Sequence, residues 1–338
     1  MENFLLTIGS DLQHATYKTK AEISGIDETG NDVAADAYGF YVQEKVILDN
    51  WVFRVGGRYS YTKHDYDEIG GTEPSEDGKS WNRFLWSAGI RYNVSKSIGI
   101  YANVGSTFLV PSAKSVGGTL KLSDRGVPGK NGQLPNPSLK PEKGLGFDIG
   151  SDVRLTSNLL LGVRGFYNTI DNAIVENVVS NNPSQSQSVN AGKSRAYGLE
   201  IEGEYQINSV FKCFANSTIT QTDVENNVDA DRDNSNVPFV PDVIANLGIS
   251  ASLPYEVTIS PYFQYVDRYY DSSSKSGRST FGEYGVVNVK ARKQLYNNRD
   301  FTADLVVDVN NMLNKKFEMP WQFQDPGFNT LASIVATF

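Results

Sequence analysis

The strongest constraint on the fold is an alternation of apolar and polar residues that runs through almost the whole chain. From Trp51 to Thr62 the odd positions carry aromatic residues, valine or glycine, and the even positions after Val52 carry small, polar or cationic residues. Successive side chains on a β-strand point to opposite faces, so each such segment is predicted to be a strand with one apolar side. The pattern recurs over 84–94 and 197–207, and no helix-period stretch competes with it. An all-β fold is therefore expected.

About fourteen segments fit the alternation template. They lie near 3–18, 34–48, 51–64, 80–94, 98–110, 144–155, 158–175, 193–207, 210–224, 241–253, 257–270, 283–295, 299–313 and 327–338. No long linker, charge block or change of composition separates them. Residues 1–338 are therefore expected to form one β-barrel domain.

The connections between these segments alternate between short and long. The short ones are 49–50, 95–97, 156–158, 208–209, 254–256 and 296–298; the long ones are 19–33, 65–79, 111–143, 176–192, 225–240, 271–282 and 314–326. Nothing in a soluble β-sandwich requires short and long connections to alternate strictly. In an outer-membrane barrel the periplasmic turns are short and the extracellular loops are long. The pattern predicts an antiparallel transmembrane β-barrel, with loops 65–79, 111–143 and 225–240 extracellular and the turn at 95–97 periplasmic. The connection 111–143 is long enough to fold over the lumen.

The two faces of the predicted strands differ in chemistry. Trp51, Trp86 and Tyr92 lie on the apolar face, in runs whose ends are rich in aromatic residues, as in the interfacial girdles of membrane barrels. The opposite face carries charges such as Arg58 and Arg91, which would be costly in a dry core. We expect the apolar face to meet outer-membrane lipid and the polar face to line a wet lumen or surround a polar plug.

Composition excludes several other classes of protein. No apolar run approaches the roughly 18 residues of a membrane helix. The 338-residue chain has a formal charge of −8, which argues against nucleic-acid binding. The single cysteine, Cys213, excludes a disulfide framework and a Cys-rich metal site. His14 and His64 lie fifty residues apart, which indicates surface or lumen histidines. The first residues lack the basic and apolar regions of a signal peptide.

Several short motifs, in the same order along the chain, resemble those of TonB-dependent outer-membrane receptors. They are YVQE at 41–44, VGGRY at 55–59, NPSLKPEK at 136–143, RAYGLEIEG at 195–203, VNNMLNKKF at 309–317 and the closing segment 326–338. Each motif is weak alone, but together they cover nearly the whole chain. The resemblance implies a receptor barrel in the outer membrane of a Gram-negative bacterium.

The resemblance also implies parts that the sequence lacks. Members of the family have an N-terminal plug domain inside a 22-stranded barrel, whereas the sequence has no plug, no energy-coupling box and about eight strands too few. The chain is therefore expected to be the C-terminal portion of such a barrel, its partners being a plug domain and a TonB-type energy-coupling protein. The implied function is active uptake of a ferric siderophore or a similar bulky nutrient such as haem or cobalamin.

Two other functions stay open. One is a self-contained porin-type passive channel, in which residues 3–18 and 327–338 would pair; a gap between them would favour the receptor. The other is an outer-membrane enzyme or adhesin barrel. No nucleophile triad, phosphate loop or dinucleotide fingerprint is present, so neither catalysis nor a cofactor is expected.

The sharpest polar feature is the ladder formed by Glu200, Glu202 and Glu204 on one face of one strand. Three neighbouring carboxylates repel one another, so cationic partners are expected nearby. The resemblance implies that Glu200 and Glu202 contact arginines of the plug. The alternative is pairing with lumen arginines of neighbouring strands. A glycosidase pair is disfavoured, because open strands in water do not hold the required geometry.

Aromatic and amide residues gather at outer-loop positions, where they suit ligand contact or the outer aromatic girdle. The ligand-binding candidates are Tyr269, Tyr270, Trp321, Gln322 and Phe323. The loop from Asp229 to Asn234 starts like a calcium loop. It lacks Gly at the sixth position and has Val240 at the twelfth instead of Glu, so a solvated acidic loop without metal is expected.

Overall fold

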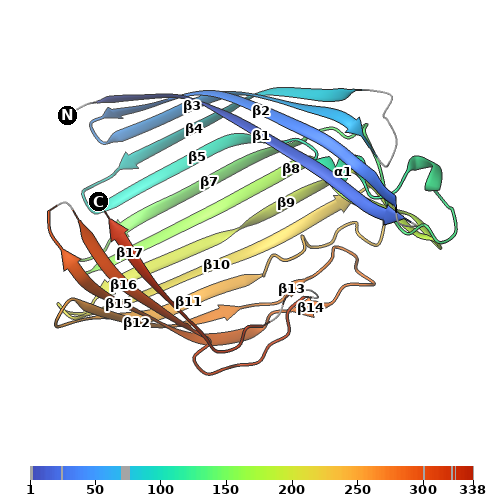
Figure 1. Ribbon diagram of the computed structural model, residues 1–338. Coiled ribbons are helices and arrows are strands. Elements are labelled where there is room, and N and C mark those ends of the chain that lie inside the picture. The colour runs from blue at the N-terminus through green and yellow to red at the C-terminus, as the bar shows by residue number, and fades with distance from the viewer. Residues whose placement is uncertain are drawn as a thin grey trace.

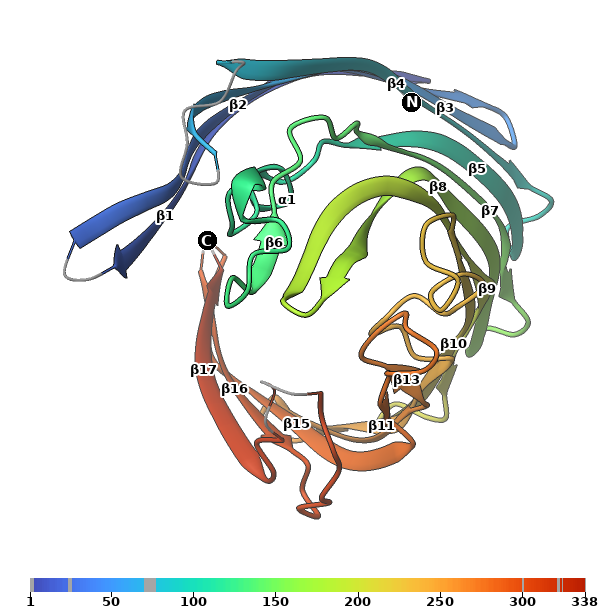
Figure 2. The same ribbon diagram turned by 90° about the vertical axis from the view of Figure 1, so that its right-hand side faces the viewer.

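The computed structural model describes residues 3–23, 26–69, 77–299, 301–320, 323 and 325–337. Over these residues most of the chain forms one strongly curved sheet, seen along its strands in Figure 2. The strands are β1 (Phe4–Ile23), β2 (Ile26–Leu48), β3 (Trp51–Glu68), β4 (Gly78–Asn93), β5 (Ile98–Leu109), β6 (Gly132–Leu134), β7 (Glu142–Arg154), β8 (Leu159–Asn181), β9 (Ser184–Gln206), β10 (Phe211–Asn226), β11 (Val243–Leu253), β12 (Val257–Val266), β13 (Tyr269–Tyr270), β14 (Thr280–Phe281), β15 (Tyr284–Asn297), β16 (Thr302–Asn310) and β17 (Asn329–Thr337). Two short helices, α1 (Ala113–Gly117) and the 3₁₀ turn η1 (Leu122–Asp124), lie between β5 and β6.

Strands adjacent in the sheet follow one another along the chain and pair antiparallel, in the order β1-β2-β3-β4-β5-β7-β8-β9-β10-β11-β12-β15-β16-β17. This path contains fourteen strands over the described ranges, so the predicted all-β fold and strand number are confirmed. β6 adds to β9 in parallel, and β13 and β14 form a separate small hairpin. No helix among the described residues has the length and apolar character needed to span a membrane. The short turns lie at one end of the sheet, where β1 begins and β17 ends (Figure 1).

Two of the predicted long loops are wrong. Residues 19–33 and 176–192 mostly continue the strands, because β1 pairs with β2 as far as Ile23 and Ile26, and β8 with β9 as far as Asn181 and Ser184. The sequence of these extensions is mostly polar, so the hydropathy alternation disappears although the backbone ladder continues. Hydropathy alternation shows that one face of a strand is apolar, but it does not show where the strand ends.

The polar face of the sheet is its concave face. Residues 110–141, here called the inner segment, contain α1, η1 and β6 and lie within the curve of the sheet (Figure 2). Tyr66, on the same face of β3 as Arg54 and Arg58, forms a buried cluster with Val116 and Leu139 of this segment. The opposite face is apolar and uncovered in this chain, with Phe84 exposed by 64%.

The inner segment is fixed to the sheet on two sides. On one side its α1 residue Val116 is fully buried against Val33 and Ile69 from the outer ends of β2 and β3. On the other side β6 pairs with Gln185–Gln187 of β9. The expectation that this long connection folds over the interior is therefore confirmed, and packing and backbone pairing both hold it there.

Charged side chains of the concave face bond across strands. Arg58 of β3 reaches over β2 to Asp11 of β1, with Nη1–Oδ1 and Nη2–Oδ2 distances of 2.7 and 2.8 Å. Gly39 of β2 leaves the space for this pair, since a Cβ there would lie 2.0 Å from Arg58 Nη2. Water screens such exposed pairs, so they order the wall more than they stabilise it.

One glycine of the RAYGLEIEG motif is predicted to be essential for strand packing. A Cβ at Gly198 would lie 2.0 Å from the backbone oxygen of Ile219 and 2.8 Å from the ring of Phe166, and a backbone atom cannot swing away. We expect Gly198→Ala to lower the free energy of unfolding by about 1–3 kcal/mol, measured by urea titration in lipid vesicles. Gly105→Ala is the matched control, because its nearest contact is an ordinary 3.5 Å to Ser87. Equal stability of the two variants would contradict this packing.

Candidate functional site

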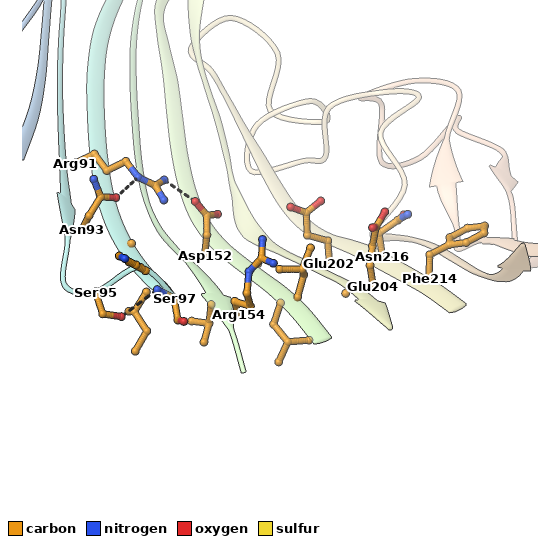
Figure 3. A pocket seen from close by; sticks show the side chains of 18 of the residues that line it. Arg91, Asn93, Ser95, Ser97, Asp152, Arg154, Glu202, Glu204, Phe214 and Asn216 are labelled. Carbon is orange, nitrogen blue, oxygen red and sulfur yellow. Dashed lines mark hydrogen bonds and ion pairs between the residues drawn. The ribbon is translucent and has the colours of Figure 1, made fainter. Parts of the chain in front are cut away.

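A polar pocket of about 450 Å³ lies on the concave wall, at the end of the sheet where the turns are short. Its floor includes Ser95–Ser97, the turn between β4 and β5, and its wall is built by strands β4, β5, β7, β8, β9 and β10. Lys79, on the same face of β4 as the pocket residue Arg91, donates from Nζ to the Pro137 carbonyl of the inner segment. The pocket therefore opens to the interior. Its charged and amide residues are Arg91, Asn93, Lys96, Asp152, Arg154, Glu202, Glu204 and Asn216, and all of them except Lys96 are labelled in Figure 3.

One side of the pocket is an ion-pair network. Arg91 of β4 contacts Asp152 of β7 across β5, with an Nη1–Oδ2 distance of 2.5 Å, and its Nε donates to Asn93 Oδ1 at 3.0 Å (Figure 3). The two charges are about half exposed, so water screens them. Strand pairing alone brings these residues together, because 61 positions separate Arg91 from Asp152.

The glutamate ladder lines the other side, and its three members differ in partners. Glu200 accepts from Arg164 Nη2 of β8 at 3.0 Å, and Glu204 lies 3.3 Å from Lys212 Nζ of β10. Glu202 lies between them, opposite Gly162 and Asn216 in the neighbouring strands. In the ranges that the structure describes, no cation lies within ion-pair distance of Glu202.

The predicted plug contacts Glu200 and Glu202 thus face the interior with different capacities. Glu200 already has the neighbouring-strand arginine that the alternative interpretation expected. Glu202 has a carboxylate on the pocket wall without a counter-charge in the described part of the chain. Contact of either residue with a plug stays a prediction.

The outer aromatic candidates lie apart from this pocket. Tyr269 is only 9% exposed and stacks on Phe281 with ring centroids 6.0 Å apart, and burial raises the pKa of its hydroxyl. The Tyr270 ring is covered by the Arg278 guanidinium at 3.6 Å. Phe323 is 61% exposed, whereas Trp321 and Gln322 lie outside the described residues. A role of these five residues in ligand binding stays a prediction, and Phe323 presents the most open surface for it.

The carboxylates of the acidic loop after β10 form hydrogen bonds and an ion pair that hold this loop together and join it to a second loop. Asp231 accepts from Ser274 Oγ at 2.5 Å and from the Ser276 amide at 3.0 Å, and the Ser274 bond holds the pKa of Asp231 below its usual range. Asp229 pairs with Arg232 at 3.2 Å. Loop 225–240 is thereby joined to loop 271–282. Across the residues described, no group of three or more His, Cys, Asp or Glu side chains is placed to hold a metal ion.

Sequence reasoning missed two features of this region. The link between Asp231 and Ser274 joins residues 43 positions apart, and no periodic signal marks it. His64 is buried, at 3% exposure, against the edges of Trp81 and Tyr66. His64 lies on the concave face of β3, as a lumen histidine would, but the packing of Trp81 and Tyr66 around it, which leaves it buried, was not expected.

Comparison with known proteins decides the family. The model for the TonB dependent receptor-like β-barrel matches residues 4–312, which is most of the chain. The chain belongs to the TonB-dependent receptor β-barrel family. The resemblance seen in the sequence motifs is confirmed.

Curated relatives in this family include siderophore receptors. The chain is 23% identical to the ferrioxamine receptor of Yersinia enterocolitica over 279 residues. This matched region covers 82% of the chain and 36% of that receptor. The chain is 22% identical over 284 residues to the ferrichrome outer membrane transporter/phage receptor of Escherichia coli, covering 82% of the chain and 34% of the relative. The chain thus spans about a third of the length of these relatives.

Solved structures agree on the fold. The ferric yersiniabactin uptake receptor FyuA from Yersinia pestis superposes with a TM-score of 0.67 at 15% identity, over 99% of this chain and 51% of that one. The copper transporter OprC gives 0.70 at 16% identity, over 100% of this chain and 55% of that one. Because these proteins are named for different cargo, the shared fold does not identify the cargo of this chain.

Proposed function

We propose that this chain is a wall of an outer-membrane receptor barrel that takes up a ferric siderophore with energy supplied through a TonB-type protein. The observation that carries the proposal is the curved antiparallel sheet, apolar outside and densely charged inside, in a family whose curated relatives bind ferrioxamine and ferrichrome. Haem and cobalamin have no such support among these relatives.

The edges of the sheet favour a receptor over a self-closed passive channel. β1 and β17 end the strand order, and in the described residues they do not pair with each other. A closed pore in lipid needs that pairing, because each unsatisfied backbone group costs several kcal/mol in the bilayer. On this proposal further strands continue the wall beyond these edges.

A plug domain is the proposed occupant of the concave side. The Glu202 carboxylate lines a pocket large enough to admit an arginine side chain, and a guanidinium would neutralise it by a charge-assisted hydrogen bond. Glu200 already contacts Arg164, so Glu202 has the greater capacity to bind an incoming cation.

The plug contact is testable by removing single charges. Glu202→Gln is expected to weaken binding of an added plug domain from a family member by about tenfold or more, since it removes an unpaired acceptor of a charged hydrogen bond. Glu204→Gln is the matched control, because its carboxylate already contacts Lys212. Binding is measured by titration in detergent micelles. If both variants bind the plug equally well, Glu202 is not the contact.

The membrane orientation is tested on the apolar face. Val163, which is 44% exposed on the outer face of β8, is proposed to meet lipid. Val163→Arg should destabilise the sheet by about 2–4 kcal/mol near the bilayer midplane, measured by refolding into lipid vesicles. Thr218→Arg, on the inner face beside Glu200, should cost much less. Equal costs would rule out the assignment of the two faces.

The cargo is tested by direct binding. We expect quenching of tryptophan fluorescence to saturate when at least one ferric siderophore is added to the chain in detergent micelles, with the iron-free chelator binding more weakly. Ferric hydroxamate and ferric catecholate complexes, haemin and cyanocobalamin form the panel. Binding of haemin or cyanocobalamin alone would contradict the siderophore proposal.

A further inference from the structure

The inner segment differs in charge from every other long connection. Residues 110–141 contain five basic residues and one acidic residue, a net charge of +4, in a chain of net charge −8. Loops 65–79 and 225–240 have net charges of −5 and −3. The basic residues are Lys114, Lys121, Arg125, Lys130 and Lys140.

These cations are not neutralised by the wall. Over the described ranges none of the five takes part in an ion pair, and the one acid of the segment, Asp124, accepts from the Lys121 backbone amide. Six cations elsewhere at the same end of the sheet have acidic partners, whereas others, such as Lys20 and Lys275, have none over the described residues. The six pairs are Lys18–Asp32, Lys63–Asp65, Lys193–Asp171, Arg195–Asp223, Arg232–Asp229 and Arg268–Asp242.

The tip of the segment is held in place by one buried amide. Gln185 of β9 is 2% exposed; its Oε1 accepts from the Gly126 amide at 2.8 Å, and its Nε2 donates to the Asp124 and Lys130 carbonyls at 2.8 and 2.7 Å. The backbone around Arg125 and Lys130 is therefore fixed while their side chains stay exposed. A fixed backbone reduces the ordering cost when a ligand binds.

The position of the segment limits what it can bind. Seen along the strands it lies inside the curve of the sheet (Figure 2), and seen from the side it stands at the long-loop ends of the strands (Figure 1), not on the apolar outer face. Leu122 and Val127, exposed by 58% and 40%, stand among the cations. The ligand that fits is an anion with apolar parts that enters the barrel from the long-loop end.

We propose that the inner segment selects ferric chelates that carry net negative charge, such as complexes of catecholates, over neutral hydroxamate complexes. This inference rests on the proposed uptake function and names the class of its substrate. Unpaired cations at the mouth of a low-dielectric cleft raise the local concentration of anions and speed their entry. The contact is electrostatic, so added salt weakens it.

The test compares an anionic and a neutral ferric chelate on four forms of the chain. The probes are a ferric tris-catecholate complex of charge −3 and a neutral ferric tris-hydroxamate complex, titrated by tryptophan quenching in uncharged detergent micelles. The variant Lys121→Gln/Arg125→Gln/Lys130→Gln removes three charges from the segment. The matched control, Lys20→Gln/Lys275→Gln/Lys316→Gln, removes three exposed charges from other long-loop positions.

We expect the unchanged chain to bind the anionic complex about tenfold or more tightly than the neutral one, and the segment variant to lose that preference. The control should keep it, and added NaCl should weaken anion binding only where the segment cations remain. Circular dichroism and thermal unfolding check that all forms are folded, and Lys121→Arg/Lys130→Arg should bind like the unchanged chain.

Equal binding of the two complexes by the unchanged chain would overturn the inference, as would an equal loss in the control. In either case the uptake proposal stands, because a ferric chelate still binds. If neither complex binds to the unchanged chain, the proposed function fails, and the inference fails with it.

Discussion

The antiparallel backbone ladder is the constraint on which the rest of this structure depends. Each strand satisfies its N–H and C=O groups on its neighbours, and because side chains alternate with a period of two, the register of each pair decides which residues face inward. A one-residue slip between β8 and β9 would move Glu200, Glu202 and Glu204 to the apolar face. The same strand registers therefore produce both the charged interior face and the apolar exterior face.

The registers also decide where charge is left over. Arg164 lies directly opposite Glu200, so that carboxylate is neutralised within the wall, whereas Glu202 lies opposite a glycine. On the cationic side, six cations of the long-loop end pair with nearby aspartates, whereas over the described residues none of the five in the inner segment has such a partner. Over the described residues, Glu202 thus has no cationic partner near the short turns, and the five bases of the inner segment have no acidic partners near the long loops. A plug and an anionic ligand are the proposed partners of these two regions.

The inner segment keeps its position because two different kinds of contact hold its two sides. Apolar burial of Val116 and Leu139 against the outer ends of β2 and β3 supplies most of the driving force. Amide hydrogen bonds to β9, such as those of Gln185, fix the orientation, since a buried amide left unpaired would cost about 1–3 kcal/mol. An exposed cationic tip can therefore stand in the interior without a large core beneath it.

The sequence by itself determined the strands and their two faces, because the alternation of 51–62 or 197–207 is a local property of the chain. The motifs also indicated the receptor family, and the loop lengths indicated an inner segment. Hydropathy did not reveal the strand extensions around 184–190, where both faces are polar. Only the tertiary structure decided that Glu200 pairs with Arg164 while Glu202 has no cationic partner among the described residues, that Tyr269 is buried, and that Asp231 binds Ser274. Each of these depends on which residue of a distant strand or loop lies opposite, and a single strand's pattern contains no information about its neighbour's register.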